Sequence, residues 1–230
     1  KGEKESALKS IVKSNSLDSK EVGSKLLLNI FRKEKDSIDR DLKKIKNKSS
    51  FDKENLDSNP LILNMTVEKE LISRLYKIKA RDQVKYQTPT YGDALGSDYK
   101  LFERNDSILR RLKEKLIAIS KDAVKSNIYI SDSFYTIFRS GGGLKCHNHL
   151  GKIDKIKGLN IARKKFSLVY YLSVGDQNCD EPGILKLENP LQEVLPKNGM
   201  IIIFPAARNH SVFYKGKQDR IIVGVNFYIT

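Results

Sequence analysis

Cysteine is scarce in this sequence, and its scarcity excludes several kinds of site. The 230 residues contain two cysteines, Cys146 and Cys179, without a C-x-x-C or zinc-ribbon spacing. This arrangement argues against a disulfide-stapled fold, a redox pair and a structural zinc site. We therefore expect two reduced thiols, with Cys146 serving a packing role on a strand.

Long apolar runs are also missing. No segment has the roughly 20 consecutive apolar residues that a membrane-spanning helix needs. Nothing near Lys1 resembles a signal peptide, and a first residue other than Met suits a piece cut from a longer protein. We expect a cytoplasmic protein that makes no membrane contact.

The positive charge is large but lacks clustering. The net charge is +15, and residues 1–126 hold 29 Lys and Arg against 20 Asp and Glu, while residues 127–230 hold 14 against 8. Acidic side chains are mixed among the basic ones, as on a solvated helix surface. This pattern favours a lysine-rich surface over a nucleic-acid site, although anionic partners stay open.

Apolar periodicity divides the chain into a helical part and a β part. Residues 1–60 predict a helical segment, either a linker or the end of a helical repeat, and residues 61–126 predict helices that support a barrel. One such helix carries Leu71, Leu75 and Ile78, and another spans residues 107–124. The stretch 86–96, with a proline and two glycines, predicts irregular structure.

From residue 127 the period changes from 3.6 to 2. Short runs rich in Ile, Val, Phe and Tyr alternate with turn residues, which predicts a closed or double-sheet antiparallel β domain over residues 127–230. The fold class is therefore α+β, with helices preceding and flanking the β domain. The predicted strands are 127–138, 166–174, 184–187, 200–204, 211–214 and 221–229.

All three histidines lie in the β part. His147 and His149 occupy positions i and i+2, which face the same way on a strand, and His210 could come opposite them in a closing sheet. Three imidazoles on one side of an ion leave its other positions open, as a catalytic metal requires. An H-x-H pair alone is weak evidence, and three histidines would suit zinc equally well.

An arginine and a tyrosine help to distinguish between metals. Arg220 begins a strongly apolar strand, and a guanidinium facing into a barrel needs a carboxylate, which a dicarboxylate co-substrate would supply. Tyr170 could add a hydroxyl to the same carboxylate. The alternative for Arg220 is a surface salt bridge with Asp219 or another acid.

These residues occur in an order that resembles the 2-oxoglutarate and iron(II)-dependent oxygenases, particularly the prolyl 4-hydroxylase-like branch. The resemblance covers about residues 127–230 and none of residues 1–126. Its elements are Gly141–Gly143, His147–His149, Ser167–Leu172, Gly183–Leu185, Pro196, Gly199, Met200–Pro205, His210, Arg220 and Asn226.

The resemblance implies a C-terminal double-stranded β-helix, or jelly roll, and a hydroxylase that uses Fe(II), 2-oxoglutarate and O2. It assigns His147 and His210 as iron ligands, and Arg220 and Tyr170 as partners of the far carboxylate of 2-oxoglutarate. Asn226 resembles a polar residue often found on the last core strand, and is grouped with the co-substrate residues.

The sequence departs from the family in two places. His149 stands where the family's H-x-D or H-x-E motif has a carboxylate, which leaves the metal site one unit more positive. We expect His149 to be the third ligand, with Asp154 as the substitute. Phe138 stands where some relatives have a tyrosine that contacts the co-substrate, which would leave more of that work to Tyr170.

The substrate is not specified by the sequence. The basic connector 150–165 is a candidate lid that would suit an acidic or phosphorylated partner, such as a protein or an acidic small molecule. Four apolar residues, Leu168, Ile184, Ile202 and Val223, are expected to line the barrel wall. Two other functions stay open: a three-histidine zinc hydrolase or hydratase, and a non-catalytic jelly-roll binding module.

Overall fold

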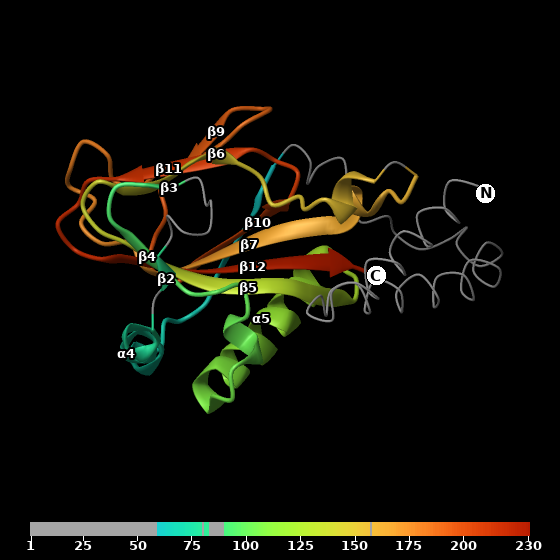
Figure 1. Ribbon diagram of the computed structural model, residues 1–230, viewed down its shortest axis with the longest axis horizontal. Helices are drawn as coiled ribbons and strands as arrows, with labels where there is room; N and C mark the ends of the chain where they lie inside the picture. Colours follow the sequence, from blue (N-terminus) through green and yellow to red (C-terminus); the bar gives the residue numbers. More distant parts are fainter. Residues whose placement is uncertain (1–58, 80, 83–89, 157) are drawn as a thin grey trace.

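Two antiparallel sheets face each other, and two helices cover the outer face of the larger sheet (Figure 1). The computed structural model describes residues 59–230 except 80, 83–89 and 157, so the predicted helical segment of residues 1–60 lies almost wholly outside the described residues. Within the described part, no helix combines the length and the apolar character needed to cross a membrane.

The larger sheet contains seven strands in the spatial order β1-β10-β7-β12-β5-β4-β2, with antiparallel neighbours throughout. Its long central strands, β7 and β12, pair over most of their length, so they form a rigid support. The strands are β1 (Leu61–Asn64), β2 (Arg81–Asp82), β4 (Ala94–Gly96), β5 (Ile128–Phe138), β7 (Lys165–Ser173), β10 (Met200–Pro205) and β12 (Arg220–Ile229).

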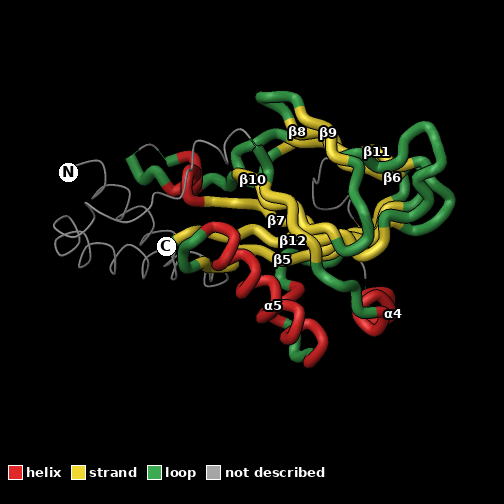
Figure 2. Tube along the Cα trace, turned by 180° about the vertical axis from the view of Figure 1, so that it is seen from behind, coloured by secondary structure: helices red, strands yellow, loops and turns green. Residues whose placement is uncertain are grey.

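The smaller sheet contains five strands in the order β3-β6-β11-β8-β9 and lies opposite the larger one (Figure 2). The chain passes repeatedly between the two sheets, which is the arrangement of a double-stranded β-helix. The predicted α+β fold class with a C-terminal jelly roll is therefore confirmed. The strands are β3 (Thr90–Tyr91), β6 (Gly142–His147), β8 (Leu185–Leu187), β9 (Gln192–Val194) and β11 (His210–Tyr214).

Among the described residues the two α-helices are α4 (Lys69–Lys77) and α5 (Ser107–Val124), and α5 has the predicted bounds. Helix α5 begins at Ser107 because the side chain of Asp106 accepts hydrogen bonds from the backbone N–H groups of Ile108 and Leu109. It ends where Lys125 adopts a left-handed conformation. Short 3-10 turns also occur: η2 (Leu101–Glu103), η3 (Ile153–Lys155) and η4 (Ile161–Lys164).

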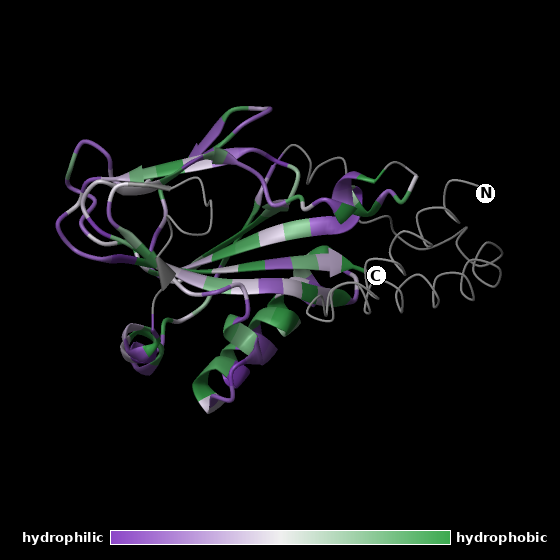
Figure 3. Cartoon of the chain, viewed as in Figure 1, coloured by the Kyte–Doolittle hydropathy of each residue, from purple (hydrophilic) through white to green (hydrophobic). Residues whose placement is uncertain are grey.

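Strand alternation gives the larger sheet two different apolar faces. One face packs on α4 and α5 through residues such as Leu168, Tyr170 and Val223. The other face packs on the smaller sheet through residues such as Tyr171 and Ile222. In Figure 3 the sheets and α5 carry most of the hydrophobic colour, whereas the loops at the barrel end farthest from the C-terminus are largely hydrophilic.

Residues 61–126 contribute more than helices. Strand β1 pairs with β10 at one edge of the larger sheet, and β4 pairs with β5 near its other edge. Strands β3 and β4 also fall within the stretch 86–96 that was predicted to be irregular. That prediction was wrong for β3 and β4 because strands of two or three residues are too short to show a period, and they form by pairing with a longer neighbour.

Candidate metal centre

The three histidines come together through the pairing of β6 with β11. His147 ends β6 and His210 begins β11, and the two are direct partners in the antiparallel register. The chain beyond β6 continues to His149, whose backbone N–H donates to the carbonyl of Ala206 at 2.9 Å. Main-chain hydrogen bonds therefore bring His147 and His149 to the same point as His210, which is distant in the sequence.

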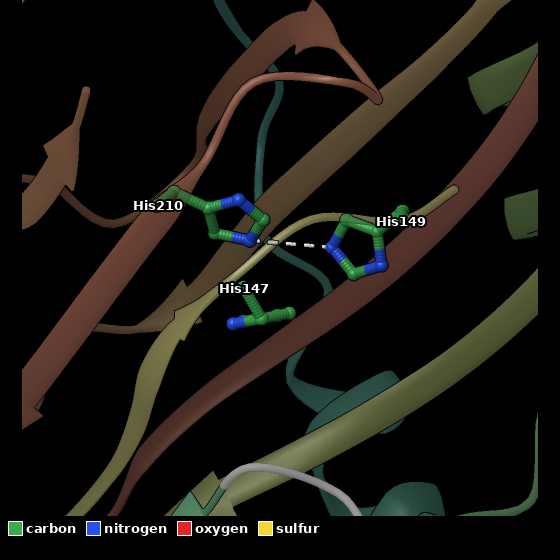
Figure 4. Close-up of side chains that lie close together, drawn as sticks. All are labelled: His147, His149 and His210. Atoms are coloured by element: carbon green, nitrogen blue, oxygen red, sulfur yellow. Dashed lines mark hydrogen bonds between the residues drawn. The ribbon is translucent and has the colours of Figure 1, made fainter. Parts of the chain in front are cut away.

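The three imidazole rings converge on that point (Figure 4). One nitrogen from each ring lies within 4.8 Å of the others, and the Nε2 atoms of His149 and His210 are 3.2 Å apart. The ring centroids are separated by 4.3 to 5.1 Å. This spacing suits three ligands of a single ion. The three residues are the ones predicted from the sequence.

The outer nitrogens of two of these rings face backbone carbonyls. His147 Nδ1 lies 2.7 Å from the carbonyl oxygen of Lys145, and His210 Nδ1 lies 3.1 Å from that of Arg208. Because a carbonyl only accepts hydrogen bonds, each Nδ1 carries the proton and each Nε2 keeps its lone pair. Both rings are thus held in the form that binds a metal through Nε2.

Burial keeps the cluster neutral. It lowers the pKa of His147, lowers the pKa of His210 to about 3, and moves the pKa of His149 well below its ordinary value. The neighbouring rings also disfavour a second positive charge on His149 and His210. Neutral imidazole is the form that ligates metals, so the donor set fits a transition metal such as ferrous iron or zinc.

Asp154 does not complete this site. One of its carboxylate oxygens accepts from Lys165 Nζ at 2.8 Å and from the backbone of Gly151 at 2.7 Å, while the other accepts from the Tyr228 hydroxyl at 2.6 Å. Its pairing with a buried lysine draws it away from the histidines. The prediction of Asp154 as a substitute ligand was wrong, and His149 is the residue in the cluster.

The same contacts anchor the connector between β6 and β7, which was predicted to be a lid. In addition to the ion pair of Asp154, the side chains of Ile153, Leu159 and Ile161 pack against Tyr228 and Tyr129. The connector is thus fastened to the end of the barrel at several points. Its role in substrate contact stays a prediction.

Arg220 lies inside the barrel with 1% of its surface exposed. Its Nη2 donates to the carbonyl of Gly183 at 2.9 Å, whereas Nε has no hydrogen-bond partner, and no carboxylate among the described residues forms an ion pair with it. The alternative partner, Asp219, instead accepts from the Tyr76 hydroxyl and lies 3.8 Å from Arg139. A buried guanidinium with an unused donor is costly, and it suits a carboxylate ligand.

Gly183 and two aromatic rings shape the space around this guanidinium. Gly183 has φ +82°, and a Cβ atom there would lie 2.8 Å from Arg220 Nε, so only glycine leaves room for the side chain. The rings of Phe138 and Tyr171 have their centroids 5.5 and 5.2 Å from the guanidinium carbon. Phe138, the second departure from the family pattern, is thus beside Arg220.

Tyr170 does not reach this space, and its neighbour Tyr171 does. Tyr170 faces the helices, and its hydroxyl donates to the carbonyl of Thr66 at 3.1 Å. Tyr171 packs in the barrel core, where burial raises the pKa of its hydroxyl and the adjacent Arg220 opposes that rise. The prediction for Tyr170 was wrong because consecutive tyrosines on a strand point to opposite faces.

Two of the four expected wall residues also lie on the helix side. Leu168 and Val223 belong to the core beneath α4 and α5, whereas Ile202 lies inside the barrel and Ile184 is half-buried just before β8. A continuous apolar run such as 168–172 has no alternation of polar and apolar residues, so the sequence alone could not show which side chains face the helices and which face the barrel interior.

Asn226 faces the histidines from β12. Its Nδ2 lies 3.5 Å from His149 Nδ1 and 3.3 Å from a carboxylate oxygen of Asp132, and its Oδ1 accepts from the Ser167 hydroxyl at 2.8 Å. Asn226 was predicted from the sequence as a site residue, whereas its contacts with Ser167 and Asp132 were not. A polar residue inside an apolar strand, as Ser167 is, was the available signal.

Solved structures share this architecture. No protein-family model and no curated protein matches the sequence. A structure of HygX from Streptomyces hygroscopicus with nickel and 2-oxoglutarate bound superposes with a TM-score of 0.56 at 14% identity, covering 74% of this chain and 83% of that one. The chain has the fold of the 2-oxoglutarate–iron(II) oxygenases.

Two further structures support this assignment of the fold. A prolyl hydroxylase from Trichoplax adhaerens, in complex with a peptide fragment of hypoxia-inducible factor, gives a TM-score of 0.55 at 14% identity, with 78% and 86% coverage. A 2OG-Fe(II) oxygenase family oxidoreductase from Burkholderia pseudomallei gives 0.50 at 13% identity, with 79% and 92% coverage. Likeness at this identity establishes the oxygenase fold, and the chemistry must be argued from the site.

Proposed function

We propose that this chain is an Fe(II)- and 2-oxoglutarate-dependent oxygenase that hydroxylates its substrate. The observation that carries the proposal is that Arg220 is buried in the same barrel as the three histidines, with an unused donor and with no carboxylate partner among the described residues. A structural arginine would have an acid beside it, because leaving a buried charge unpaired costs several kcal/mol, on the order of 3–5 when a partner is removed.

The residues divide the work of binding. His147, His149 and His210 would hold the metal, while Arg220 and the Tyr171 hydroxyl would hold the far carboxylate of 2-oxoglutarate. With iron, 2-oxoglutarate and O2 bound, the site would couple the conversion of 2-oxoglutarate into succinate and carbon dioxide to oxidation of the substrate.

Aromatic side chains line the barrel interior beside the proposed binding site. Phe204 packs edge-on against His210 with 4.9 Å between ring centroids, and Phe138 covers one side of Arg220. These apolar walls would exclude water and so strengthen the electrostatic interactions inside, while Arg220 would orient the co-substrate by its carboxylate. The protein would therefore bind and orient the co-substrate and exclude water from the site.

The two alternative functions explain less of the site. A zinc hydrolase or hydratase could use the same three histidines, but it would leave Arg220 without a task. A binding module without catalysis would need neither the histidine cluster nor the buried cation. The oxygenase uses both.

We further propose that the substrate is an acidic small molecule or a protein, and that the enzyme acts in the cytoplasm. The connector 150–165 contains six Lys or Arg residues and one acid, which would suit an anionic group. Structures of the same fold carry hygromycin B in one case and a peptide in another. Both cysteines are free, which supports a reducing compartment. Nucleic acid stays a less favoured partner, because the basic residues are interspersed with acids.

The test is an anaerobic titration of the Fe(II)-loaded protein with 2-oxoglutarate. We expect a weak visible charge-transfer band that saturates, because the ketoacid chelates ferrous iron. Arg220→Ala should retain iron and weaken 2-oxoglutarate binding, whereas the exposed control Arg139→Ala should bind as the wild type does. Tight zinc binding with no band would overturn the proposal and favour the hydrolase.

A further inference from the structure

His149 differs from the other two histidines in what its outer nitrogen contacts. His147 and His210 each place Nδ1 against a backbone carbonyl, which fixes the proton there. His149 Nδ1 instead faces the side-chain amide of Asn226, which can present either an oxygen or an NH2 group. The tautomer of His149 is thus the only one of the three that a side chain controls.

In this structure Asn226 turns its NH2 group toward His149. The amide is buried, with its oxygen accepting from Ser167 and its nitrogen pointing at Asp132. An NH2 group only donates, so His149 Nδ1 is the acceptor and His149 Nε2 carries the proton. That proton points at His210 Nε2, 3.2 Å away, whose lone pair is free to accept it (Figure 4).

This hydrogen bond uses the same two nitrogens that a metal would need. To ligate through Nε2, His149 must release its Nε2 proton to solvent and take one up on Nδ1. A protonated Nδ1 then requires an acceptor, which Asn226 provides only if the amide turns over to present Oδ1. Ser167 tolerates either orientation, because a hydroxyl both donates and accepts.

We propose that Asn226 is the positioning residue for His149, and that its amide turns over as the metal binds. Asp132 opposes this turn, because its carboxylate oxygen, 3.3 Å from the amide nitrogen, would then face the amide oxygen. Ser131 and Lys165, at 2.9 and 4.0 Å from that carboxylate oxygen, keep the carboxylate in place. Asn226 thus supports metal binding while Asp132 restrains it, so one pair of residues sets the metal affinity.

The inference rests on the metal site of the proposed function and not on its co-substrate. The first test is therefore 15N NMR of the histidine side chains in the wild-type protein, without metal and with Zn²⁺ as a diamagnetic probe. We expect His149 to carry its proton on Nε2 without metal and on Nδ1 with Zn²⁺. A proton already on Nδ1 in the metal-free protein would overturn the inference.

The second test compares two variants by competition titration with Zn²⁺. Asn226→Leu keeps the volume but removes the acceptor, and should weaken affinity about tenfold or more, the range typical of lost partners of metal-ligating histidines. Asp132→Asn should strengthen affinity, because its amide can donate to the turned Asn226 oxygen. A purely structural role would weaken binding in both variants.

These results separate the two proposals. Opposite changes in Zn²⁺ affinity support the role of Asn226 whether or not 2-oxoglutarate binds. A charge-transfer band in a protein whose affinity is unaffected by either substitution would retain the oxygenase and reject this inference. If Asn226→Leu does not fold, Asp132→Asn and the wild-type tautomers still decide.

Discussion

At the scale of single residues, two consecutive tyrosines have different expected effects. Tyr171→Phe removes the hydroxyl beside Arg220 and should weaken 2-oxoglutarate binding by about ten- to 150-fold, since a hydrogen bond to a charged group is worth about 1.5–3 kcal/mol. Tyr170→Phe loses only a bond to Thr66 and should leave that affinity unchanged. Titration of both variants with 2-oxoglutarate checks this. Equal effects would contradict the placement of Tyr170 and Tyr171 on opposite faces of β7.

The metal ligands give a second prediction at this scale. His210→Ala should abolish metal binding, because it removes a ligand from a set of only three. Cys146→Ser is the control, since Cys146 adjoins His147 but its thiol is exposed, contrary to the predicted packing role, and donates to Glu188 outside the cluster. Metal content after dialysis distinguishes the two variants, and retention of metal by His210→Ala would place the site elsewhere.

The candidate site was predictable at this scale only in part. The H-x-H spacing and the isolated His210 and Arg220 were visible because such residues are rare or costly inside an apolar strand. Tyr171 and Asp132 were not, because their facing depends on strand register and on the bulge between Asn226 and Phe227. Neither feature leaves a local mark in the sequence.

At the scale of elements, α5 depends on its N-cap. Burial raises the pKa of Asp106, but hydrogen bonds from the Leu109 backbone and from Arg74 outweigh it and hold that pKa below its ordinary value. Asp106→Ala should lower the free energy of unfolding by about 1 kcal/mol. Denaturant unfolding at neutral pH measures this, and an unchanged midpoint would show that the cap contributes nothing.

The lowered pKa also sets a pH dependence for the same element. Because the folded pKa lies below the unfolded one, the contribution of the charged carboxylate is complete above about pH 4 and is lost as the pH falls through the folded value. Asp106→Asn keeps a capping oxygen without the charge. Its stability should therefore fall less steeply with acid than that of the wild type in unfolding curves from pH 5 to 2.

The predicted bounds of helices and strands were most accurate where the local sequence pattern was strongest. Helix α5 and strands β5 and β12 were predicted closely, because long periodic segments with a capping residue or apolar alternation specify themselves. Strands β1 to β4 were missed because they are two to four residues long and form by pairing: β1 with β10, β2 with β4, β3 with β6 and β4 with β5.

At the scale of the whole molecule, stability should depend on the ligands. A ligand that binds only the folded state at about one hundred times its Kd adds roughly 2.7 kcal/mol. For a protein of this size that corresponds to a rise in Tm of about 5–10 °C. Thermal unfolding with Fe(II) or Zn²⁺ should show this rise in the wild type but not in His210→Ala, and an equal rise in both would indicate metal binding away from the histidines.

The positions of Arg220 and Asn226 on β12 constrain how many residues can separate them. Arg220 and Asn226 face the barrel, whereas Ile221, Val223 and Val225 between them face the helices. Deleting one residue between them would turn one of the two polar residues toward α5, and the aliphatic residues on the same side of the deletion toward the barrel interior. Inserting two would keep the faces but separate the pair by about 7 Å more. Homologues of this protein can therefore vary freely in loop length while conserving the interval from Arg220 to Asn226, and that interval offers a way to identify them where overall similarity has decayed.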